Sequence, residues 1–568
     1  MSFGEGYLKG REGISGPFSQ PIDTLFERFD RPHTPGLAVA VVKDGVVVHQ
    51  RGYGVANIED DVPISSDTVF RLGSVSKQFC ATGILLLEDR AELSLDDDVR
   101  RFVPEMPDYG LPITLRHLLT MTSGLPDGLG MALFSGLHVH SPISRAQILA
   151  MQLRQSRPMF PPGDDCTYCN TNYALLSLIC ERISGRPLAT FLHDEIFLPL
   201  GMNSTRLTSK MTDVVPRKSR GYQPAGYWDR KDAAAANAAC AHEIGVMQVE
   251  LSGDGGIDTT ITDMVKWTQH YRRPTKFGPN YRERMETRGI LNDGQMTAYA
   301  CGLTVMQYRG LRRGGHAGGM PGYVADFAFY PEHDLGVVLL ANVLDVALLQ
   351  SADRIADLVH RDGIAPAAQE SRFANDSDPE IAALQGLYVC EEQGYSLQFV
   401  RETDEDFCYL MGEPIRLIHD GPSRYHSAKD TVHVRIEVAP GSPGSRPALH
   451  VQFGALPKCV FQPVAPEPLH VDTPDDYVGE YVSDELGECH RVRWENNDLV
   501  VELSSPLRTL LWRSLSRRIG DVFTAEIPGE PSASNVTVRF VRGPNGSVHE
   551  LAYALSRIRG VTFRKMAR

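Results

Sequence analysis

The C-terminal part of the chain contains an internal repeat. Segment 386–394 (GLYVCEEQG) matches segment 479–487 (GEYVSDELG) at five of nine positions, with an offset of 93 residues. Short alternating apolar and polar runs follow each copy, as at 395–399 and 499–503, without helical periodicity. Composition alone would explain such strands without a duplication, but self-similarity at a fixed offset favours two copies of one unit. We therefore predict two small antiparallel β domains, each a barrel or a sandwich.

The first 365 residues mix helical and strand patterns instead. Two apolar runs, 37–42 and 46–49, flank an Asp-Gly turn and predict a β-hairpin. The segment Ser76 to Asp89 has the spacing of a helix, and the last two strands are expected at 323–330 and 335–340. Further helical patterns lie at 115–121, 148–153 and 172–183. Segment 365–379 is rich in Ala, Pro, Ser and Asp without periodicity and predicts a linker. The resulting domain boundaries are 1–365, 380–466 and 472–568.

Composition excludes several classes of partner. The 568 residues have a formal net charge of -14, which disfavours binding to nucleic acid. The N-terminus lacks the apolar core of a signal peptide and no run is long enough to span a bilayer, so we expect a cytoplasmic protein without a membrane partner. Ten scattered cysteines do not form a disulfide framework, and Cys166 and Cys169 lack a second pair for a zinc site.

The motif S-x-x-K at Ser74 and Lys77 is the first candidate for catalysis. A separation of three residues at the start of a helix places both side chains on one face of the helix, within reach of each other. A serine hydroxyl becomes a nucleophile when a neighbouring base removes its proton, and an uncharged lysine is such a base. Backbone N–H groups at a helix N-terminus would also stabilise an oxyanion.

A second candidate is Tyr168 with Asn170, in a loop that precedes a helical pattern. A phenol beside an ammonium group loses its proton more easily and would relay one to a leaving amine. The Asn170 amide would hold a substrate carbonyl or Lys77. A third candidate is the glycine-rich segment around His316, Gly318 and Gly319, just before the strand 323–330. Glycines let a strand backbone approach a ligand, and the histidine would contact substrate or tune Tyr168.

S-x-x-K, Y-x-N and H-x-G in this order resemble the class C β-lactamase and serine penicillin-recognising family. The supporting matches are segments 113–119, 123–124, 253–256 and 263–264. The resemblance covers about residues 20 to 360 and implies an α+β fold. It implies a β-lactamase/transpeptidase-like catalytic domain, with an antiparallel sheet and helices on both sides, followed here by the two small antiparallel β-barrel domains.

The chain is most similar to the bacterial D-aminopeptidase family, through 74–79, the Tyr-Cys-Asn form of the second motif, the appended β domains and segment 479–486. That family releases N-terminal D-residues from short peptides and amides without a metal or other cofactor. The resemblance implies Ser74 as nucleophile, Lys77 as base and Tyr168 as proton donor to the leaving group. It implies His316 as a substrate-binding or Tyr168-tuning residue, and an oxyanion hole from the N–H groups of Ser74 and Gly319.

One departure concerns recognition of the substrate's amine. In the D-aminopeptidase family a loop of the last domain offers an acid to this amine, and the comparable loop, 527–534, is shorter here. Glu530 would serve as the acid that binds the substrate's amine, and Glu526 is the second candidate for this role.

The alternatives left open are an esterase, β-lactamase or D,D-peptidase with the same site, and a non-catalytic binding protein on this fold. The expected partner is a small peptide or amide substrate, with inhibition by β-lactams and a homodimer as further expectations.

Overall fold

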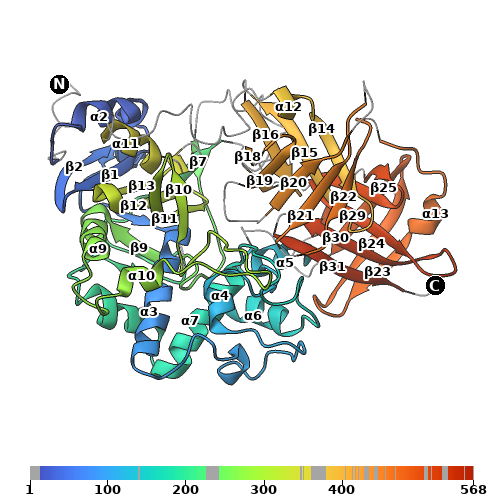
Figure 1. The fold of residues 1–568 in the computed structure, drawn as a ribbon, viewed down its shortest axis with the longest axis horizontal. Coiled ribbons are helices and arrows are strands. Elements are labelled where there is room, and N and C mark those ends of the chain that lie inside the picture. The colour runs from blue at the N-terminus through green and yellow to red at the C-terminus, as the bar shows by residue number, and fades with distance from the viewer. Residues whose placement is uncertain are drawn as a thin grey trace.

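A computed structural model of the chain gives two halves of different architecture (Figure 1). A sheet with helices forms the N-terminal half, and two all-β units form the C-terminal half. The described residues are 13–137, 141–210, 212–225, 242–345, 348–349, 351–359, 379–402, 405–411, 413–415, 417–419, 421–427, 434–440, 445–454, 456–466, 468–504, 509–512, 515–526, 535–555 and 557–566.

The N-terminal half is built on an antiparallel sheet, six-stranded in its described residues. Its order is β10 (Thr304–Tyr308), β11 (Leu311–Met320), β12 (Tyr323–Tyr330), β13 (Leu335–Ala341), β1 (Leu37–Lys43) and β2 (Val46–Tyr53). The predicted hairpin is therefore confirmed as β1 and β2. Asp44 and Gly45 both have positive φ, 52° and 81°, which a two-residue turn of this kind requires.

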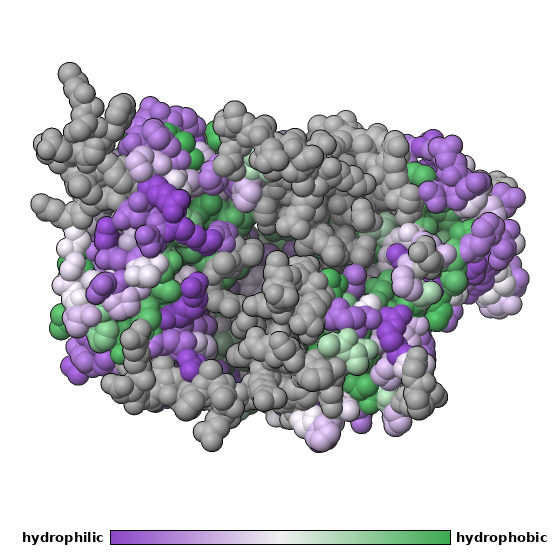
Figure 2. Space-filling view, turned by 90° about the horizontal axis from the view of Figure 1, so that it is seen from above, coloured by the Kyte–Doolittle hydropathy of each residue, from purple (hydrophilic) through white to green (hydrophobic). Residues whose placement is uncertain are grey.

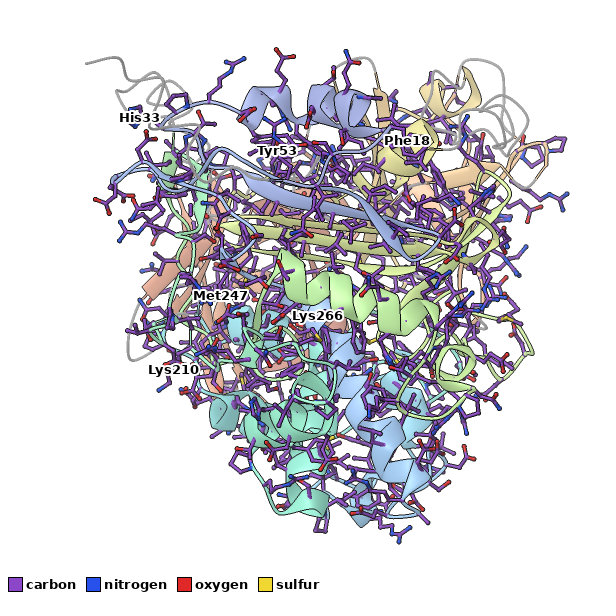
Figure 3. The ribbon with its side chains drawn as sticks, turned by 90° about the vertical axis from the view of Figure 1, so that its left-hand side faces the viewer. Phe18, His33, Tyr53, Lys210, Met247 and Lys266 are labelled. Carbon is purple, nitrogen blue, oxygen red and sulfur yellow. The ribbon has the colours of Figure 1, made fainter. Side chains whose placement is uncertain are left out.

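Alternate residues of these strands pack on opposite faces of the sheet, so both faces are apolar. Val39 and Val41 join one hydrophobic cluster with helices α2 (Ser19–Phe26) and α11 (Ser351–Val359). Ala38 and Ala40 join the larger cluster below, where α9 (Ile261–Arg272) lies along the sheet. Figure 3, in which Lys266 marks α9, shows this helix on the face opposite α2. Helices on both sides agree with the predicted fold class.

A helical layer lies beyond α9 and carries much of the site. It comprises α3 (Lys77–Asp89), α4 (Leu115–Leu119), α5 (Gly128–Phe134), α6 (Arg145–Leu153), α7 (Asn170–Ser184), α8 (Leu188–Leu192) and α10 (Tyr281–Met285). The remaining strands of this half form small sheets: β3 (Val55–Asn57) with β4 (Val62–Pro63), β5 (Val69–Arg71) with β9 (Ile257–Thr260) and β6 (Arg206–Leu207), and β7 (Tyr222–Pro224) with β8 (His242–Ile244).

The C-terminal half consists of two curled, barrel-like antiparallel sheets with one topology. The first has the order β17 (Glu413–Ile415), β16 (Glu405–Leu410), β15 (Tyr395–Glu402), β14 (Gly386–Cys390), β22 (Cys459–Pro463), β21 (Leu449–Phe453), β20 (Val434–Val438), β19 (Arg424–Ser427) and β18 (Leu417–His419). The second has the order β26 (Thr509–Trp512), β25 (Asp498–Ser504), β24 (Glu488–Glu495), β23 (Gly479–Ser483), β31 (Ile558–Lys565), β30 (Val548–Leu555), β29 (Asn535–Arg542), β28 (Val522–Glu526) and β27 (Ser516–Ile519).

In each sheet the first strand pairs with the last, and the remaining strands follow in the same sequence. The two copies of the repeat begin at equivalent strands, β14 and β23. The repeated tyrosines, Tyr388 and Tyr481, are fully buried in both. This correspondence is expected of a duplicated unit. Short helices precede the sheets: α12 (Pro379–Ala382) and α13 (Pro474–Tyr477).

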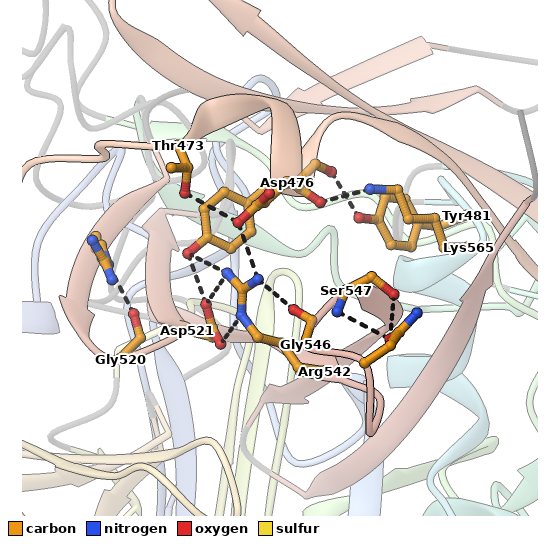
Figure 4. Close-up of polar contacts among 12 residues, drawn as sticks. Thr473, Asp476, Tyr481, Gly520, Asp521, Arg542, Gly546, Ser547 and Lys565 are labelled. Atoms are coloured by element: carbon orange, nitrogen blue, oxygen red, sulfur yellow. Dashed lines mark hydrogen bonds and ion pairs between the residues drawn. The ribbon is translucent and has the colours of Figure 1, made fainter.

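A charged network fixes α13 against the last sheet (Figure 4). Arg542 donates to both carboxylate oxygens of Asp521, to Asp476 of α13 and to the Gly546 carbonyl. Lys565 donates to the Asp476 carbonyl at 2.6 Å. These bonds tie two strands, β29 and β31, and the turns at Asp521 and Gly546 to the helix that leads into the sheet.

The last sheet also packs directly on the helices of the N-terminal half. Its core residues share one hydrophobic cluster with residues of α5 and α6, and Figure 1 shows α5 beside β31. His490 donates from Nε2 to the Phe134 carbonyl at 2.8 Å, and the rings of Phe134 and Tyr553 stack at 5.1 Å. On the face shown in Figure 2, the described hydrophilic and hydrophobic side chains are interspersed, as is usual for a protein surface.

Most predicted elements agree with the structure to within a few residues. One difference is local: a 3₁₀ turn, η2 (Gly73–Ser76), precedes α3, which begins at Lys77 rather than Ser76. Most of the predicted linker, 365–378, lies outside the described residues, and the three domain boundaries stay predictions. No described helix combines the length and apolar character that crossing a membrane requires.

Candidate active site

Buried pairing fixes the backbone that presents Ser74. Strand β5 pairs with β9, and the Leu72 N–H donates to the Ile257 carbonyl at 2.9 Å. Arg71 binds Asp258 through two hydrogen bonds of 2.7 and 2.9 Å, with both side chains fully buried. Gly73 then adopts a φ of 54°, which turns the chain from the strand into η2. Ser74 is therefore held on a rigid turn, with its side chain only half-buried.

The fully buried Lys77 directs its amine at Ser74. Nζ of Lys77 lies 3.1 Å from the Ser74 Oγ. It also donates to Oδ1 of Asn170 at 2.8 Å and to the carbonyl oxygen of Asp254 at 2.7 Å. A lysine amine donates to oxygen acceptors. The Asn170 and Asp254 oxygens thus hold the amine at hydrogen-bonding distance from the Ser74 hydroxyl.

The loop before α7 brings Tyr168 and Asn170 to this pair. The Asn170 N–H donates to Asp127 Oδ2 at 2.6 Å, and the same carboxylate caps the first turn of α5. The Tyr168 ring centroid lies 4.9 Å from Lys77 Nζ. Tyr168 is buried, and its hydroxyl makes no hydrogen bond to any residue that the structure describes. The structure therefore brings Lys77, Tyr168 and Asn170 together beside Ser74.

Strand β11 lies against the nucleophile turn through its glycines. A Cβ at Gly318 would lie 2.1 Å from the Leu72 carbonyl oxygen and 3.0 Å from the Ser74 nitrogen, so only glycine permits this approach. A Cβ at Gly319 would meet no atom within 4 Å, because this residue faces open space. The backbones of Ser74 and Gly319 thus lie on neighbouring segments, and a Cβ at Gly73 would lie 3.3 Å from the Gly319 nitrogen. An oxyanion hole made from their N–H groups stays a prediction.

His316 has a different set of partners from the one predicted. Its ring lies 5.9 Å from that of Tyr168, but its nitrogens contact the Ala317 carbonyl at 2.6 Å and the Tyr299 hydroxyl at 2.9 Å. Because a carbonyl only accepts, Nδ1 carries the proton and Nε2 accepts from Tyr299. Burial lowers the pKa of His316 to about 3, and the charges of Lys77 and Arg557 act in the same direction. His316 is therefore a neutral ring.

The turn after β30 and the start of β31 place two arginines, Arg557 and Arg559, beside the Tyr168 loop. The Arg557 guanidinium carbon lies 4.6 Å from the centroid of the Tyr168 ring. Arg559 donates to Asp165 at 2.6 Å and to Thr167 at 2.7 Å, with Arg559 and Asp165 almost completely buried. The last sheet thus contacts the candidate site directly and holds the loop that carries Tyr168.

The acid predicted to bind the substrate's amine is not placed. Glu530 lies outside the described residues, and Glu526 ends β28 without a described side chain. In the described part of the chain, no group of three or more His, Cys, Asp or Glu side chains could hold a metal ion.

A comparison with known families matches residues 22–360, more than half of the chain, to the family described as Beta-lactamase. The chain belongs to the beta-lactamase family. Penicillin-binding protein 4* of Bacillus subtilis (strain 168) is 29% identical over 343 residues, which are 59% of this chain and 75% of that protein. The D-aminopeptidase of Gluconobacter oxydans (strain 621H) is 28% identical over 388 residues, 68% of each chain.

Among solved structures, the octameric penicillin-binding protein homologue from Pyrococcus abyssi superposes with a TM-score of 0.53 at 23% identity. The superposition covers 78% of this chain and 99% of the homologue's chain. At this identity the likeness supports the fold, and it agrees with the predicted beta-lactamase-like sheet and helices. With its family relatives and its Ser-Lys-Tyr geometry, this member of the beta-lactamase family is a serine hydrolase of the penicillin-binding fold.

Several residues of the site were not foreseen from the sequence. Segment 253–256 contributes to the family resemblance, but nothing in its residues indicates that the Asp254 carbonyl binds Lys77. Tyr299 gave no signal, since a single tyrosine in an irregular segment matches no motif. Arg557 lies in the turn after β30 and Arg559 at the start of β31, and only the fold brings these two residues to the Tyr168 loop.

Proposed function

We propose that this serine hydrolase releases N-terminal D-amino acids from short peptides, amides or esters through an acyl-enzyme on Ser74. The similarity to the D-aminopeptidase of Gluconobacter oxydans supports the specificity, because it extends over 68% of each chain. The position of Lys77 supports the chemistry.

The observation that carries the mechanism is the set of three contacts around the Lys77 amine. Its distances to Asn170, Asp254 and Ser74 are 2.8, 2.7 and 3.1 Å. Lys77 takes the proton of the Ser74 hydroxyl, and Oγ forms a bond to the substrate carbonyl carbon. The resulting oxyanion accepts hydrogen bonds from the N–H groups of Ser74 and Gly319.

Tyr168 completes the proton transfer. As the bond from the carbonyl carbon to the leaving nitrogen breaks, the Tyr168 hydroxyl gives its proton to that nitrogen. The ammonium of Lys77 returns a proton to Tyr168, whose ring centroid lies 4.9 Å from the Lys77 nitrogen. Water then attacks the acyl-enzyme by the reverse route and frees Ser74. His316, neutral and bound to Tyr299, supports the strand that carries Gly318 and Gly319.

Stereospecific turnover tests this function. The protein is incubated with D-Ala-p-nitroanilide and with its L-isomer, and the acyl adduct is located by mass spectrometry. We expect turnover of the D-isomer and an adduct on Ser74 that Ser74→Ala abolishes. An adduct on Ser74 without turnover of the D-isomer would refute the specificity and keep the hydrolase. Labelling of the Ser74→Ala variant by a fluorophosphonate at the wild-type level would refute the nucleophile.

An esterase, β-lactamase or D,D-peptidase activity remains the main alternative, because one acylation site cleaves all these substrates. The ratio of kcat/KM for a short-chain ester to that for the D-amide separates them. A non-catalytic binding protein is the second alternative, and a missing adduct would favour it. The similarity to Penicillin-binding protein 4* supports inhibition by β-lactams. Cytoplasmic location and a homodimer stay predictions; the homologue from Pyrococcus abyssi is octameric.

A further inference from the structure

The first β unit, formed by strands β14 to β22, lies directly against the loop that carries Tyr168. Gly454 follows the last residue of β21 and has a φ of 51°, in the left-handed region that favours glycine. A Cβ at Gly454 would lie 2.7 Å from the Asp164 carbonyl oxygen, 2.7 Å from Asp165 Oδ1 and 2.8 Å from the Asp165 Cα. Each of these distances is shorter than a van der Waals contact, so only glycine lets the two backbones approach this closely.

The same unit also packs around the ion pair between Arg559 and Asp165. The Arg559 guanidinium carbon lies 5.1 Å from the ring centroid of Phe453 and 5.3 Å from that of Phe160, which belongs to the N-terminal half. The ring of Tyr395 packs on Phe453 at 5.7 Å. The Arg559 and Asp165 side chains are 4% and 0% exposed. Because water is excluded here, the two charges depend on each other and hold the loop in one geometry.

The position of this loop determines where the Tyr168 hydroxyl lies. Asp165 precedes Tyr168 by three residues, and Thr167 between them accepts a hydrogen bond from Arg559 at 2.7 Å. The Tyr168 hydroxyl makes no hydrogen bond to any residue that the structure describes, so the backbone and the ring contacts must orient it. A reacting group that is misplaced by about 1 Å can lower the rate by about 100-fold.

We propose that the first β unit positions Tyr168 for proton transfer, with Gly454 and Phe453 as its positioning residues. Gly454 sets how closely the unit approaches the loop backbone, and Phe453 contacts the arginine that binds the loop. This inference rests on the proposed role of Tyr168 as proton donor to the leaving group. Its consequence is that disturbing the unit slows substrates whose leaving group needs a proton more than substrates whose leaving group does not.

The test uses phenyl acetate and p-nitrophenyl acetate, which differ only in the nitro group. Near neutral pH p-nitrophenolate departs without a proton, whereas the more basic phenolate gains from protonation. In Gly454→Ala the added methyl group must push the loop away, so we expect kcat/KM to fall by about 10-fold for phenyl acetate and by less than about 3-fold for p-nitrophenyl acetate. Tyr168→Phe should show the same selective loss, and a larger one.

Phe453→Leu is a second variant that adds no atoms at the contact. It keeps an apolar side chain but removes the ring beside Arg559, so we expect a smaller loss with the same selectivity for phenyl acetate. Gly546→Ala is the matched control, because Gly546 has a φ of 79° and an added Cβ would meet no atom within 4 Å. It introduces the same kind of backbone strain away from the loop and should leave both rates unchanged. Urea unfolding checks that each variant is folded under the assay conditions.

Equal losses for the two esters in Gly454→Ala and Phe453→Leu would indicate a general structural role and overturn the inference. Unchanged rates in both variants would overturn it as well. In either case the proposed function stands if Tyr168→Phe retains its selective loss. An equal loss for both esters in Tyr168→Phe would refute the proposed proton donor and this inference together, as would the absence of hydrolysis of either ester with no adduct on Ser74.

Discussion

At the scale of single residues, the site depends on how closely three backbone segments approach one another. The spacing of Ser74 and Lys77 along one helical turn made their contact predictable. Their chemistry, however, requires acceptors for the Lys77 hydrogens, and these come from Asn170 and the Asp254 carbonyl, far away in sequence. The approach of β11 depends in turn on Gly318.

Adjacent glycines of β11 allow this dependence to be measured. Gly318→Ala would place a methyl group 2.1 Å from the Leu72 carbonyl oxygen, so strand and turn must separate. We expect kcat/KM to fall by about 100-fold, because the oxyanion donors lose their alignment. In Gly319→Ala the added methyl group has no atom within 4 Å, and the backbone N–H group is kept. It should retain most activity, and equal losses in both variants would argue against the predicted oxyanion hole.

At the scale of elements, the Tyr168 loop is held by β31 of the last sheet. The Arg559 side chain, 4% exposed, bonds Asp165 and Thr167, the two polar residues nearest to Tyr168 on its N-terminal side. A loop without regular structure would otherwise sample many conformations. The buried Arg559–Asp165 ion pair fixes one of these conformations, because breaking the pair would leave a buried charge without a partner.

Replacement of Arg559 tests this element. In Arg559→Met the buried carboxylate of Asp165 keeps its charge and loses its main partner, so we expect the free energy of unfolding to fall by about 3–5 kcal/mol. The rate should fall as well, because Tyr168 loses its support. Asp165→Asn combined with Arg559→Met removes the stranded charge and should recover part of the stability in urea unfolding. Recovery of full kcat/KM in that double variant would show that Arg559 does not position Tyr168.

How much of this was predictable differs between elements. The hairpin 37–49 and the strands 323–330 and 335–340 have local patterns, and the structure reproduces them closely. The repeat at Tyr388 and Tyr481 indicated the two β units, because each copy begins the same arrangement of strands. Arg557 and Arg559 escaped prediction, since contacts between distant elements leave no local pattern. Lys77 could be paired with Ser74 by spacing alone, whereas the partners of His316 depend on the tertiary fold.

At the scale of the whole molecule, the last sheet and the N-terminal half form one continuous packed structure. Residues of α5, α6 and the last sheet share a hydrophobic cluster, so separating the halves would expose a large apolar surface. His490 crosses this contact: it donates to the Phe134 carbonyl and accepts from the Tyr553 hydroxyl, each at 2.8 Å. Arg557 and Arg559 reach Tyr168 only while this packing is intact.

The pH dependence of stability should report on this contact. Burial lowers the pKa of His490 to about 3, from an ordinary value of 6.5. Between these values the unfolded chain binds a proton that the folded chain excludes. The contribution of His490 to stability is therefore complete above pH 6.5 and is lost as the pH falls towards 3, with a slope of at most about 1.4 kcal/mol per pH unit.

Buried His49, His270 and His316, whose pKa values are also lowered, add to this slope, so the variant must be compared with wild-type protein at each pH. His490→Gln keeps a donor for the Phe134 carbonyl but does not titrate. Its free energy of urea unfolding should therefore change less between pH 6.5 and 4 than that of wild-type protein, although it starts lower. His549→Gln, at an exposed position of β30, should reproduce the wild-type slope. A slope in His490→Gln equal to that of wild-type protein would mean that the halves separate before His490 is protonated. Tyr168 would then lose its contacts with Arg557 and Arg559 in acid, while the sheet that carries the two arginines stays folded.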